Sequence, residues 1–534
     1  MKADTVFSKV FAYRSTVCFF VMSAFFLSGI LRVAVVATKG YSTVQANQES
    51  YRISLERQRG TIFDCNMIPL TNTEKYTVAA VSPTPSAAAG LKSLFPDGVP
   101  EGTAKELALG KPAVCRVPRT IDCEGISFAA LYTHYGSDIS APHLIGYTDS
   151  TGHGAFGLEK AYDDILYGRS EPAAVFTVNG NGSALGGVSP SFENIEMPQS
   201  YGVVSTIDIN IQNAVREAAS GIEKGAVLVC EIKTGKIRAA LSLPTFDPSN
   251  ISSDLNNPNS PFLDRTVTAF SVGSVFKPCV AAAALDGGIN NFAYNCTGST
   301  YIIDRSFNCH KRDGHGEVDL QKALAFSCNT FFYNFSQTVG AERIIKKASI
   351  LGFGNRLSIA DNMFSDAGNL TSLNSLGNAA ALANLSIGQG DLLLSPMSML
   401  TLYCAIGGKG RYYVPSVVEG TVKNGKFIPY DNGSPTVAMS ESTAETLLGC
   451  LSTVITEGTG KSAAPTLTSA AGKTATAQTG RYYDDGTEIT NSWFCGVFPL
   501  EEPEYAVVIM SEGKQSVTDS QVFARTADGI MRLG

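Results

Sequence analysis

The longest uninterrupted apolar stretch of the chain lies near its N-terminus. From Ser15 to Leu31 there is no charged residue, and these 17 residues reach roughly 25 Å as a helix, near the lower limit for crossing a bilayer. Apolar residues continue from Val33 to Thr38, and the intervening Arg32 can extend its side chain to the lipid head groups. The pattern predicts one transmembrane anchor at residues 15–38.

Basic residues give this anchor a direction. Lys2, Lys9 and Arg14 precede it, so the positive-inside rule predicts a cytoplasmic tail at residues 1–14 and an extracytoplasmic location for everything after Lys39. The alternative is a signal peptide cleaved near residues 35–37, which Arg32 disfavours because it separates the apolar core from that site. Either interpretation exports the bulk of the chain. No later stretch is long and apolar enough to span a bilayer, so we expect a single-pass protein of the cell membrane.

Two further regions follow the anchor. Between residues 39 and 199 the pattern alternates between short strands and turns, and it closes with a glycine-rich turn at 179–187 and a linker at 190–200. This region is predicted to form a separate N-terminal domain.

The pattern changes after residue 200. Ile211, Val215 and Ala218 recur at helical spacing and predict a helix at 209–220. Apolar runs at 226–232 and 237–242 flank a glycine turn and predict a β-hairpin. An alanine-rich, mostly helical region follows, strands return at 492–498 and 505–511, and an amphipathic helix covers 517–533. Strands at both ends with helices between them predict an α+β domain at 200–534, a mixed sheet covered by helices.

Composition narrows the class of protein. A chain of 534 residues is too long for one core, and 44% hydrophobic with 17% charged residues is typical of globular proteins. A net charge of −7 gives no electrostatic support to nucleic-acid binding, so no nucleic-acid partner is expected. The 12 cysteines are spread over the whole length, unlike a compact disulfide framework.

Acyl-transfer chemistry is suggested by one short motif. Ser274 and Lys277 are three residues apart, which on a helix places both side chains on one face. A buried lysine has its charge disfavoured and can accept the serine proton. Gly273 permits a tight entry, and a helix start at Ser274 would offer free N–H groups. Alone, however, a serine three residues before a lysine is a weak signal.

Two more motifs strengthen the interpretation. Ser327 and Asn329 form an S-x-N motif 53 positions after Ser274, on an apolar stretch that reads as helix, and Lys473-Thr474 follows 144 positions after Asn329. The order S-x-x-K, S-x-N, K-T-G is that of serine penicillin-recognising enzymes. With the membrane anchor and the exported region, the chain resembles a class B penicillin-binding protein.

Smaller matches surround the three motifs. Arg59-Gly60 with Asp64, and later Gly157-Leu158-Glu159, resemble segments of the elongated pedestal domain of that family. Further landmarks are Thr245-Phe246-Asp247-Pro248, Arg265, Ile387-Gly388-Gln389-Gly390 with Ser395-Pro396, and Trp493-Phe494. The resemblance therefore extends from the anchor to the last helix, and it implies that residues 39–199 form the pedestal.

The resemblance also implies roles for single residues. Ser274 would be acylated by a D-alanyl-D-alanine stem peptide, and Lys277 would carry the proton. Ser327 and Asn329 would shuttle protons and hold the substrate amide. Lys473 and Thr474 would bind the terminal carboxylate, and the backbone N–H groups of Ser274 and Thr476 would form the oxyanion hole. Ala475 departs from the family, which usually has glycine there, and this puts the affinity for β-lactams in doubt.

The implied activity is a peptidoglycan D,D-transpeptidase of cell elongation, division or sporulation, acting on stem peptides and inhibited by β-lactams. No cofactor is required for such catalysis. Class B members lack a glycan-polymerising domain, so the resemblance implies a membrane glycan polymerase of the shape, elongation, division and sporulation type as a partner.

A metal site is a separate hypothesis. Cys296, Cys309, His315 and Cys328 are the residue types of a tetrahedral structural zinc site, and some elongation-type relatives carry a metal-ligand set between the first two motifs. Asp313 could be a further ligand or a hydrogen-bond partner. A Cys296–Cys309 disulfide and buried free thiols are the alternatives.

Two other functions remain open at this point. A β-lactamase or β-lactam sensor of the same fold would also use Ser274, although a sensor usually needs a cytoplasmic signalling part and a lactamase needs no pedestal. A catalytically idle scaffold that activates a membrane glycan polymerase is the second alternative, which the intact set of motifs disfavours.

Overall fold

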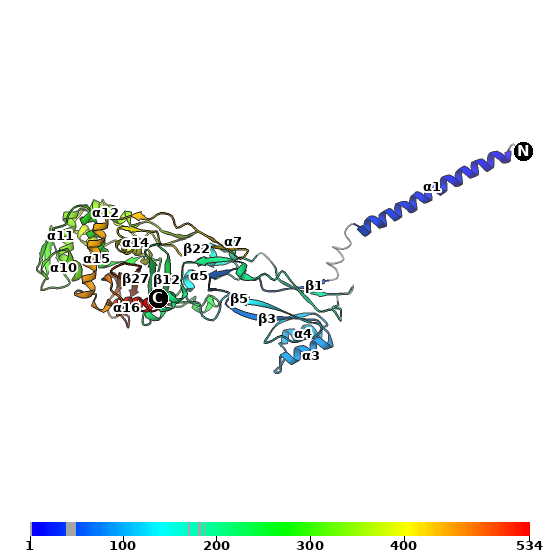
Figure 1. The fold of residues 1–534 in the computed structure, drawn as a ribbon, viewed down its shortest axis with the longest axis horizontal. Helices are drawn as coiled ribbons and strands as arrows, with labels where there is room; N and C mark the ends of the chain where they lie inside the picture. The colour runs from blue at the N-terminus through cyan, green and yellow to red at the C-terminus, as the bar shows by residue number, and fades with distance from the viewer. Residues whose placement is uncertain (1–2, 39–49, 169–170, 180–182, 186) are drawn as a thin grey trace. The chain divides into compact units, whose positions relative to one another are not determined.

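The computed structural model describes residues 3–38, 50–168, 171–179, 183–185 and 187–534. Lys2, Lys39 and part of the predicted glycine-rich turn at 179–187 lie outside these ranges. The chain divides into two compact units, the first formed by residues 1–57, 75–131 and 170–196 and the second by 58–74, 132–169 and 197–534. Figure 1 shows the path of the chain from the blue N-terminal helix to the red C-terminal helix.

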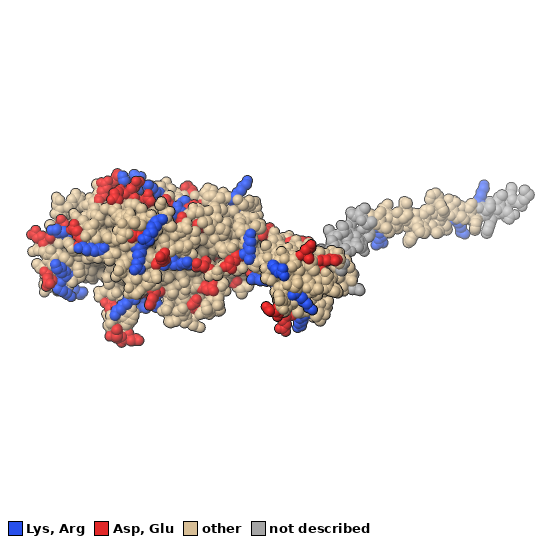
Figure 2. Space-filling model, turned by 60° about the horizontal axis from the view of Figure 1, so that its bottom comes forward, with Lys and Arg blue, Asp and Glu red and all other residues tan. Residues whose placement is uncertain are grey.

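The first unit begins with helix α1 (Ala3–Thr38). Its apolar span runs from Lys9 to Val35 with a mean hydropathy of 2.1, and by length and composition it is a candidate membrane anchor. The helix is longer than the predicted anchor at 15–38, because Lys9 and Arg14 continue the same helix instead of ending it. In Figure 2 this helix is drawn mostly tan, with few charged side chains.

Two small sheets complete the first unit. Strands β1 (Ser50–Ser54), β8 (Ala173–Thr177) and β9 (Ser191–Glu193) form one of them. Strands β4 (Ala113–Val117), β3 (Glu74–Val81) and β5 (Ile126–Thr133) form the other. Helices α3 (Pro85–Leu94) and α4 (Glu101–Ala108) accompany the second sheet, and Leu91 and Leu94 of α3 share a core with Val81.

A five-stranded antiparallel sheet is the centre of the second unit. Its order is β12 (Ile237–Leu243), β11 (Gly225–Glu231), β27 (Tyr505–Glu512), β26 (Glu488–Phe498) and β25 (Ala471–Tyr482). The predicted hairpin and both predicted C-terminal strands are confirmed. The α+β class is also confirmed. All neighbouring strands of this sheet are antiparallel, and a parallel pair of strands in this unit lies in a smaller sheet.

Alternating residues of the strands serve two separate cores. Val507 and Ile509 of β27 pack with helices α8 (Ile209–Ala218) and α16 (Asp519–Met531). Val508 and Met510 face the opposite way, into the large core that contains α9 (Lys277–Asp286), α11 (Asn329–Val339), α14 (Pro396–Gly407) and α15 (Glu441–Thr456). The period of two in a strand therefore gives three layers, with helices on both faces of the sheet.

A smaller four-stranded sheet contains parallel pairing. Strand β2 (Thr61–Phe63) pairs in parallel with β10 (Tyr201–Ser205), which pairs antiparallel with β22 (Val418–Lys423) and, beyond it, β23 (Lys426–Pro429). This pairing joins residues 58–74 to the second unit, although the sequence assigned them to the pedestal. The predicted single boundary at residue 200 therefore does not describe residues 58–74, which belong to the same compact unit as residues 197–534.

The two weakest sequence landmarks meet in this second unit. The guanidinium of Arg59, which is 6% exposed, contacts the fully buried carboxylate of Glu159 at 2.7 Å. His134 Nε2 lies 2.6 Å from the other carboxylate oxygen of Glu159, and His134 Nδ1 lies 3.1 Å from Asn72 Oδ1. Burial alone would raise the pKa of Glu159, but His134 and Arg59 hold it below the usual range. The arginine and the glutamate therefore form a buried, hydrogen-bonded ion pair.

Candidate active site and candidate metal centre

The predicted nucleophile lies at a helix start. Ser274 is in a single 3-10 turn, Gly273–Phe276, which leads directly into α9, and Pro278 stands in the first turn of that helix. Gly273 has φ +64°, a left-handed conformation, and a Cβ there would lie 3.2 Å from the carbonyl oxygen of Thr476. Its N–H donates to the carbonyl of Gly388 at 2.9 Å. Glycine is needed because the turn passes close to two other backbone segments.

Three of the predicted catalytic side chains, Ser274, Ser327 and Asn329, are connected to a fourth, Lys277, by hydrogen bonds. Lys277 is fully buried, and its Nζ donates to the carbonyl of Ser327 at 2.8 Å, to Ser327 Oγ at 3.2 Å and to Asn329 Oδ1 at 2.7 Å. Ser327 Oγ in turn donates to Ser274 Oγ at 3.1 Å. The side chains form a continuous chain of hydrogen bonds from Ser274 through Ser327 to Lys277.

Burial determines the protonation of this lysine. Removal from water lowers the pKa of Lys277 to about 7, and negative charge on Cys328 and Cys309 opposes the shift. Burial, followed by the charge of Lys277, also lowers the pKa of Lys473 well below its ordinary value. Two ammonium groups close together disfavour each other's charge, so the site favours a neutral amine on one of them.

The S-x-N motif interrupts the expected helix instead of lying within it. Phe326, Ser327 and Cys328 form the break between α10 (Leu320–Ala325) and α11, and Asn329 is the first residue of α11. Ser327 has φ +53°, a conformation that costs a non-glycine residue about 1–2 kcal/mol. The hydrogen bonds to Lys277 offset this cost. They require the carbonyl and hydroxyl of Ser327 and the side-chain amide oxygen of Asn329 to face Lys277 together.

The third motif lies on the edge strand β25. Lys473, Ala475 and Ala477 are buried, whereas Thr474 and Thr476 lie on the more open face. Lys473 Nζ donates to the carbonyl of Thr474 at 3.0 Å. The ammonium group therefore lies beneath the strand, and the two threonine hydroxyls are the groups of this motif on its open face.

Ala475, where the family usually has glycine, belongs to the buried face. It is 7% exposed, and its Cβ would lie 3.4 Å from a Cβ at Gly273. The methyl group thus packs beneath the nucleophile turn instead of projecting beside Thr474 and Thr476. Because of this orientation, the methyl group itself does not occupy the face that those threonines share.

One of the smaller landmarks, Trp493, and the buried Tyr403 hold the nucleophile segment in place. Trp493 Nε1 donates to the carbonyl of Ser271 at 2.8 Å, and Tyr403 Oη donates to the carbonyl of Val275 at 3.2 Å. Arg265, 3% exposed, pairs with Glu512 at 2.6 Å. The bonds from Trp493 and Tyr403 fix the backbone immediately before and after Ser274, whereas Arg265 binds β27 and the carbonyl of Asn259.

Reasoning from the sequence missed one residue at the site. Thr459 Oγ1 lies 2.8 Å from Thr474 Oγ1, and its N–H donates to the carbonyl of Ala325 at 3.0 Å, two residues before Ser327. A Cβ at the preceding Gly458 would lie 2.1 Å from that same carbonyl oxygen. The Gly458-Thr459-Gly460 turn therefore links the second and third motifs, and its flanking glycines were the only available signal.

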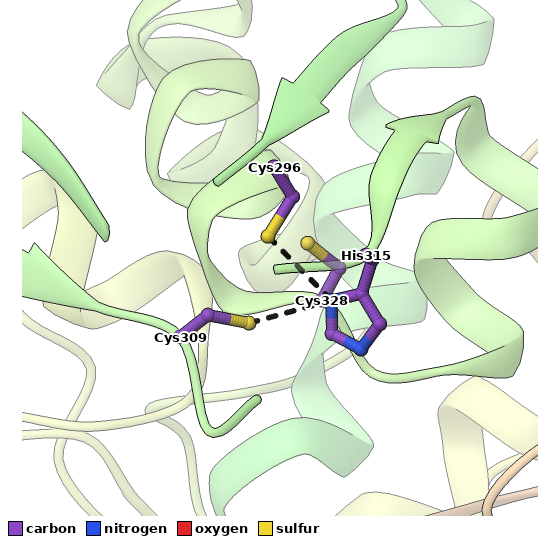
Figure 3. A group of neighbouring side chains, drawn as sticks. All are labelled: Cys296, Cys309, His315 and Cys328. Carbon is purple, nitrogen blue, oxygen red and sulfur yellow. Dashed lines mark hydrogen bonds between the residues drawn. The ribbon is translucent and has the colours of Figure 1, made fainter. Parts of the chain in front are cut away.

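The four predicted metal ligands also come together. The Sγ atoms of Cys296 and Cys309 each lie 3.6 Å from His315 Nδ1, and the ligand atoms of all four residues lie within 4.8 Å of one another. Tetrahedral zinc, with bonds of about 2.3 Å to sulfur and about 2.0 Å to nitrogen, separates such ligands by about 3.5 Å. Figure 3 shows the three thiols gathered around the His315 ring.

The alternatives to a metal can be compared with this geometry. All 12 cysteines are free thiols, Cys296 and Cys309 included, so the pair is not joined by a disulfide. Asp313 is exposed and is not part of the group of four. Cys328 lies between Ser327 and Asn329, so the cluster is attached to the second motif.

The chain is similar to a known protein family and to several known proteins. A family model described as penicillin binding protein transpeptidase domain matches residues 225–532. The peptidoglycan D,D-transpeptidase MrdA of Acinetobacter baumannii is 24% identical over 398 residues, which cover 67% of this chain and 57% of that protein. Penicillin-binding protein PbpB of Mycolicibacterium smegmatis is 28% identical over 408 residues, 71% of this chain and 60% of that protein. The matched region is thus less than two thirds of the length of either relative.

A third relative and the solved structures extend the likeness. Stage V sporulation protein D of Bacillus subtilis is 24% identical over 498 residues, 86% of this chain and 75% of that protein. The D,D-transpeptidase domain of a peptidoglycan glycosyltransferase from Eggerthella lenta has a TM-score of 0.66 at 21% identity, covering 90% of this chain and 99% of that one. Penicillin-binding protein 3 from Mycobacterium tuberculosis, complexed with aztreonam, has a TM-score of 0.65 at 22% identity, covering 90% and 97%. At this identity the structural likeness concerns the fold.

Proposed function

Given that the chain belongs to the penicillin-binding protein transpeptidase family, with class B members among its relatives, we propose that it is a serine D,D-transpeptidase that cross-links peptidoglycan stem peptides. The observation that carries the proposal is the hydrogen-bonded chain from Ser274 through Ser327 to Lys277. A serine hydroxyl connected to a buried amine of lowered pKa is an activated nucleophile.

The first half-reaction acylates Ser274. Its Oγ attacks the carbonyl carbon of the penultimate D-alanine, and the Ser274 proton passes through Ser327 Oγ to Lys277 Nζ. A hydroxyl can both donate and accept, so Ser327 reverses its hydrogen bonds during this transfer. The C–N bond then breaks, and the terminal D-alanine leaves with a proton from Lys277. The second half-reaction transfers the acyl group to an amine of another stem peptide, or to water.

Substrate binding is assigned to the edge of β25. A peptide lying along this edge would place its terminal carboxylate at the hydroxyls of Thr474 and Thr476, above Lys473. A carboxylate there favours the charged form of Lys473, and this charge in turn favours the neutral form of Lys277. Substrate binding would therefore prepare the base. The N–H groups of Ser274 and Thr476 are the proposed oxyanion donors.

Covalent labelling tests this assignment. A fluorescent penicillin is expected to form a stable adduct with the full chain in detergent or lipid nanodiscs, and peptide mapping is expected to locate the adduct on Ser274. Ser274→Ala should abolish labelling, whereas Ser271→Ala, three residues away and contacted by Trp493 through its backbone carbonyl, should retain it. Labelling that survives in Ser274→Ala would refute the assignment. Turnover of penicillin within seconds would favour a lactamase instead.

Location and partner are part of the same proposal. Helix α1 would anchor the protein in the membrane with Lys9 and Arg14 on the cytoplasmic side, leaving the catalytic domain outside. Glycan strands would come from a separate membrane polymerase of the shape, elongation, division and sporulation type. Accessibility of an added N-terminal tag to protease in intact cells and in inside-out vesicles distinguishes the two orientations.

We further propose that Cys296, Cys309, His315 and Cys328 hold a structural zinc ion. The metal would make this cluster rigid, and because Cys328 lies between Ser327 and Asn329, it would also hold these two residues in place. Elemental analysis of the purified chain should give about one zinc per chain, because structural sites of this type are nearly full. Cys296→Ser should lower the content several-fold, while Cys123→Ser, which changes a half-buried thiol of the first unit, should not. Less than about a tenth of an equivalent in the unaltered chain would exclude the site.

A further inference from the structure

The second unit contains a cavity of about 440 Å³. The described residues that line it include none from the three motifs. Its walls are mainly apolar and come from α5 (Pro142–Ile145), α6 (Gly157–Ala161), the hairpin of β18 (Ser358–Ala360) and β19 (Met363–Phe364), and the start of α14. The principal apolar side chains are Leu144, Phe156, Ile359, Met363, Met397 and Val417. A volume of this size suits a small organic ligand.

One wall of the cavity presents a hydrogen-bond acceptor. His143 lines the cavity and is 4% exposed. Its Nε2 lies 2.6 Å from the carbonyl oxygen of Pro261, so Nε2 must be the donor and Nδ1 of the neutral ring an acceptor. Within the described ranges, Nδ1 has no hydrogen-bond partner. A ligand in the cavity that carries an N–H or O–H group could donate to this nitrogen.

Asp264 adds a second acceptor to the lining. Its Oδ1 already accepts from the N–H and the hydroxyl of Thr266, at 3.0 and 2.5 Å, and no hydrogen bond to Oδ2 occurs among the residues that the structure describes. His143 and Asp264 together therefore select for hydrogen-bond donors and disfavour an anionic group beside them.

The lining also contains two cations. Lys160 and Arg356 are both exposed, and over the described part of the chain neither forms an ion pair with a carboxylate. The guanidinium of Arg356 lies over the Phe364 ring, 4.8 Å from its centroid, which restrains this side chain. Being exposed while His143 is buried, the two cations belong to the solvent side of the cavity, where an anionic group of a ligand would be attracted.

We propose that this cavity binds a small amphipathic anion: an apolar, ring-sized body between Phe156, Met363 and Met397, an N–H or O–H group directed at His143, and an anionic group paired with Lys160 and Arg356. The site is separate from the acyl-transfer site, and its occupancy does not depend on Ser274.

A commercial probe has these three parts. In 8-anilinonaphthalene-1-sulfonate an apolar ring system carries one N–H and one sulfonate, and its fluorescence rises on entering an apolar site. N-phenyl-1-naphthylamine has the same rings and N–H without the sulfonate, and so isolates the contribution of charge. Both are titrated against the full chain in lipid nanodiscs, with empty nanodiscs as the blank.

The expected results separate the cavity from non-specific binding. Saturable binding of the sulfonate should weaken about five- to tenfold in Lys160→Gln/Arg356→Gln, since each exposed ion pair contributes up to about 1 kcal/mol. The uncharged probe should bind that variant and the unaltered chain equally. Lys233→Gln/Lys409→Gln, two exposed lysines elsewhere, should leave both affinities within about twofold. Acylation by benzylpenicillin, or Ser274→Ala, should also change neither.

A cavity-filling variant completes the test. Ala161 lines the cavity from a half-buried position on α6, so Ala161→Trp should remove saturable binding of both probes while the melting temperature stays within a few degrees. If Ala161→Trp and Lys160→Gln/Arg356→Gln both bind the sulfonate as the unaltered chain does, the proposal is wrong. It is equally wrong if the distant lysine pair weakens binding as much as the cavity pair.

Discussion

The rate of acylation should follow the protonation of Lys277. If the neutral amine accepts the Ser274 proton through Ser327, the rate constant is proportional to the neutral fraction of Lys277. Its pKa of about 7 results from burial. Because the reactive form is the unprotonated one, the sign is clear: acylation accelerates as the pH rises through 7 and levels off above it.

The magnitude follows from the size of the shift. At pH 7 a lysine of ordinary pKa, about 10.4, is neutral in roughly one molecule in 2,500, whereas a lysine with pKa of about 7 is neutral in about half of the molecules. Burial thus increases the population of the base about 1,000-fold. Between pH 5 and pH 8 the neutral fraction, and with it the rate, should rise by about 90-fold.

Fluorescent penicillin measures this rate directly. The second-order rate constant of labelling is determined for the full chain between pH 5 and 9, with near-UV circular dichroism recorded at each pH to verify the fold. Lys277→Arg is the matched control, because a guanidinium stays charged throughout this range. Its rate should be at least about 1,000-fold lower, without an inflection near pH 7.

Either of two results would refute the reasoning. A profile that is flat from pH 5 to 8, or that inflects only above about 9, would mean that the amine does not act as the base at its lowered pKa. A Lys277→Arg variant that keeps the same inflection would assign the titration to another group.

Three further predictions concern residues that hold the second unit and its site together. Glu159→Gln, which removes the fully buried one of the two carboxylates paired with Arg59, should lower the free energy of unfolding in urea by about 3 kcal/mol, whereas Lys233→Ala, which removes an exposed pair, should change it by less than about 1 kcal/mol; similar losses for both would contradict the importance of the buried ion pair. Thr459→Val should slow penicillin labelling about five- to tenfold through loss of the hydrogen bond to Thr474, and Thr459→Ser should restore it; equal rates for valine and serine would exclude a positioning role. Gly273→Ala should slow labelling at least about tenfold, because the left-handed turn costs alanine about 1–2 kcal/mol; Gly377→Ala, with no atom within 4 Å of its Cβ, is the control, and an unchanged rate for Gly273→Ala would contradict the argument.

Local patterns in the sequence predicted the regular elements well. The hairpin of β11 and β12, the strands β26 and β27, and the helices α8 and α16 all follow from a period of two or of 3.6 over a few residues. The meeting of the Ser274, Ser327 and Lys473 segments was inferred from the order of the motifs. Physical reasoning on the sequence alone could not bring three distant segments together.

Features that depend on tertiary contacts were not predictable. The apolar stretch around Ser327 reads as helix, yet the helix breaks there, and the carbonyl of Ser327 accepts from Lys277. Apart from its flanking glycines, Thr459 has no local signal, since its importance depends on Thr474 on another element. The return of residues 58–74 to the second unit depends on the pairing of β2 with β10, which joins Thr61 to Gly202.

The contacts around Arg59 and Glu159 join two stretches of the chain that are far apart in sequence. The Asn72 amide nitrogen donates to the carbonyls of Arg59 and Gly60, so the Asn72 amide oxygen faces His134 Nδ1, 3.1 Å away. The Asn72 N–H also donates to the carbonyl of His134 at 2.8 Å, and His134 Nε2 lies 2.6 Å from Glu159. Residues 58–74 and 132–169 of the second unit are therefore fastened to each other on either side of residues 75–131, so the two ends of that intervening segment are held together by side chains as well as by the backbone.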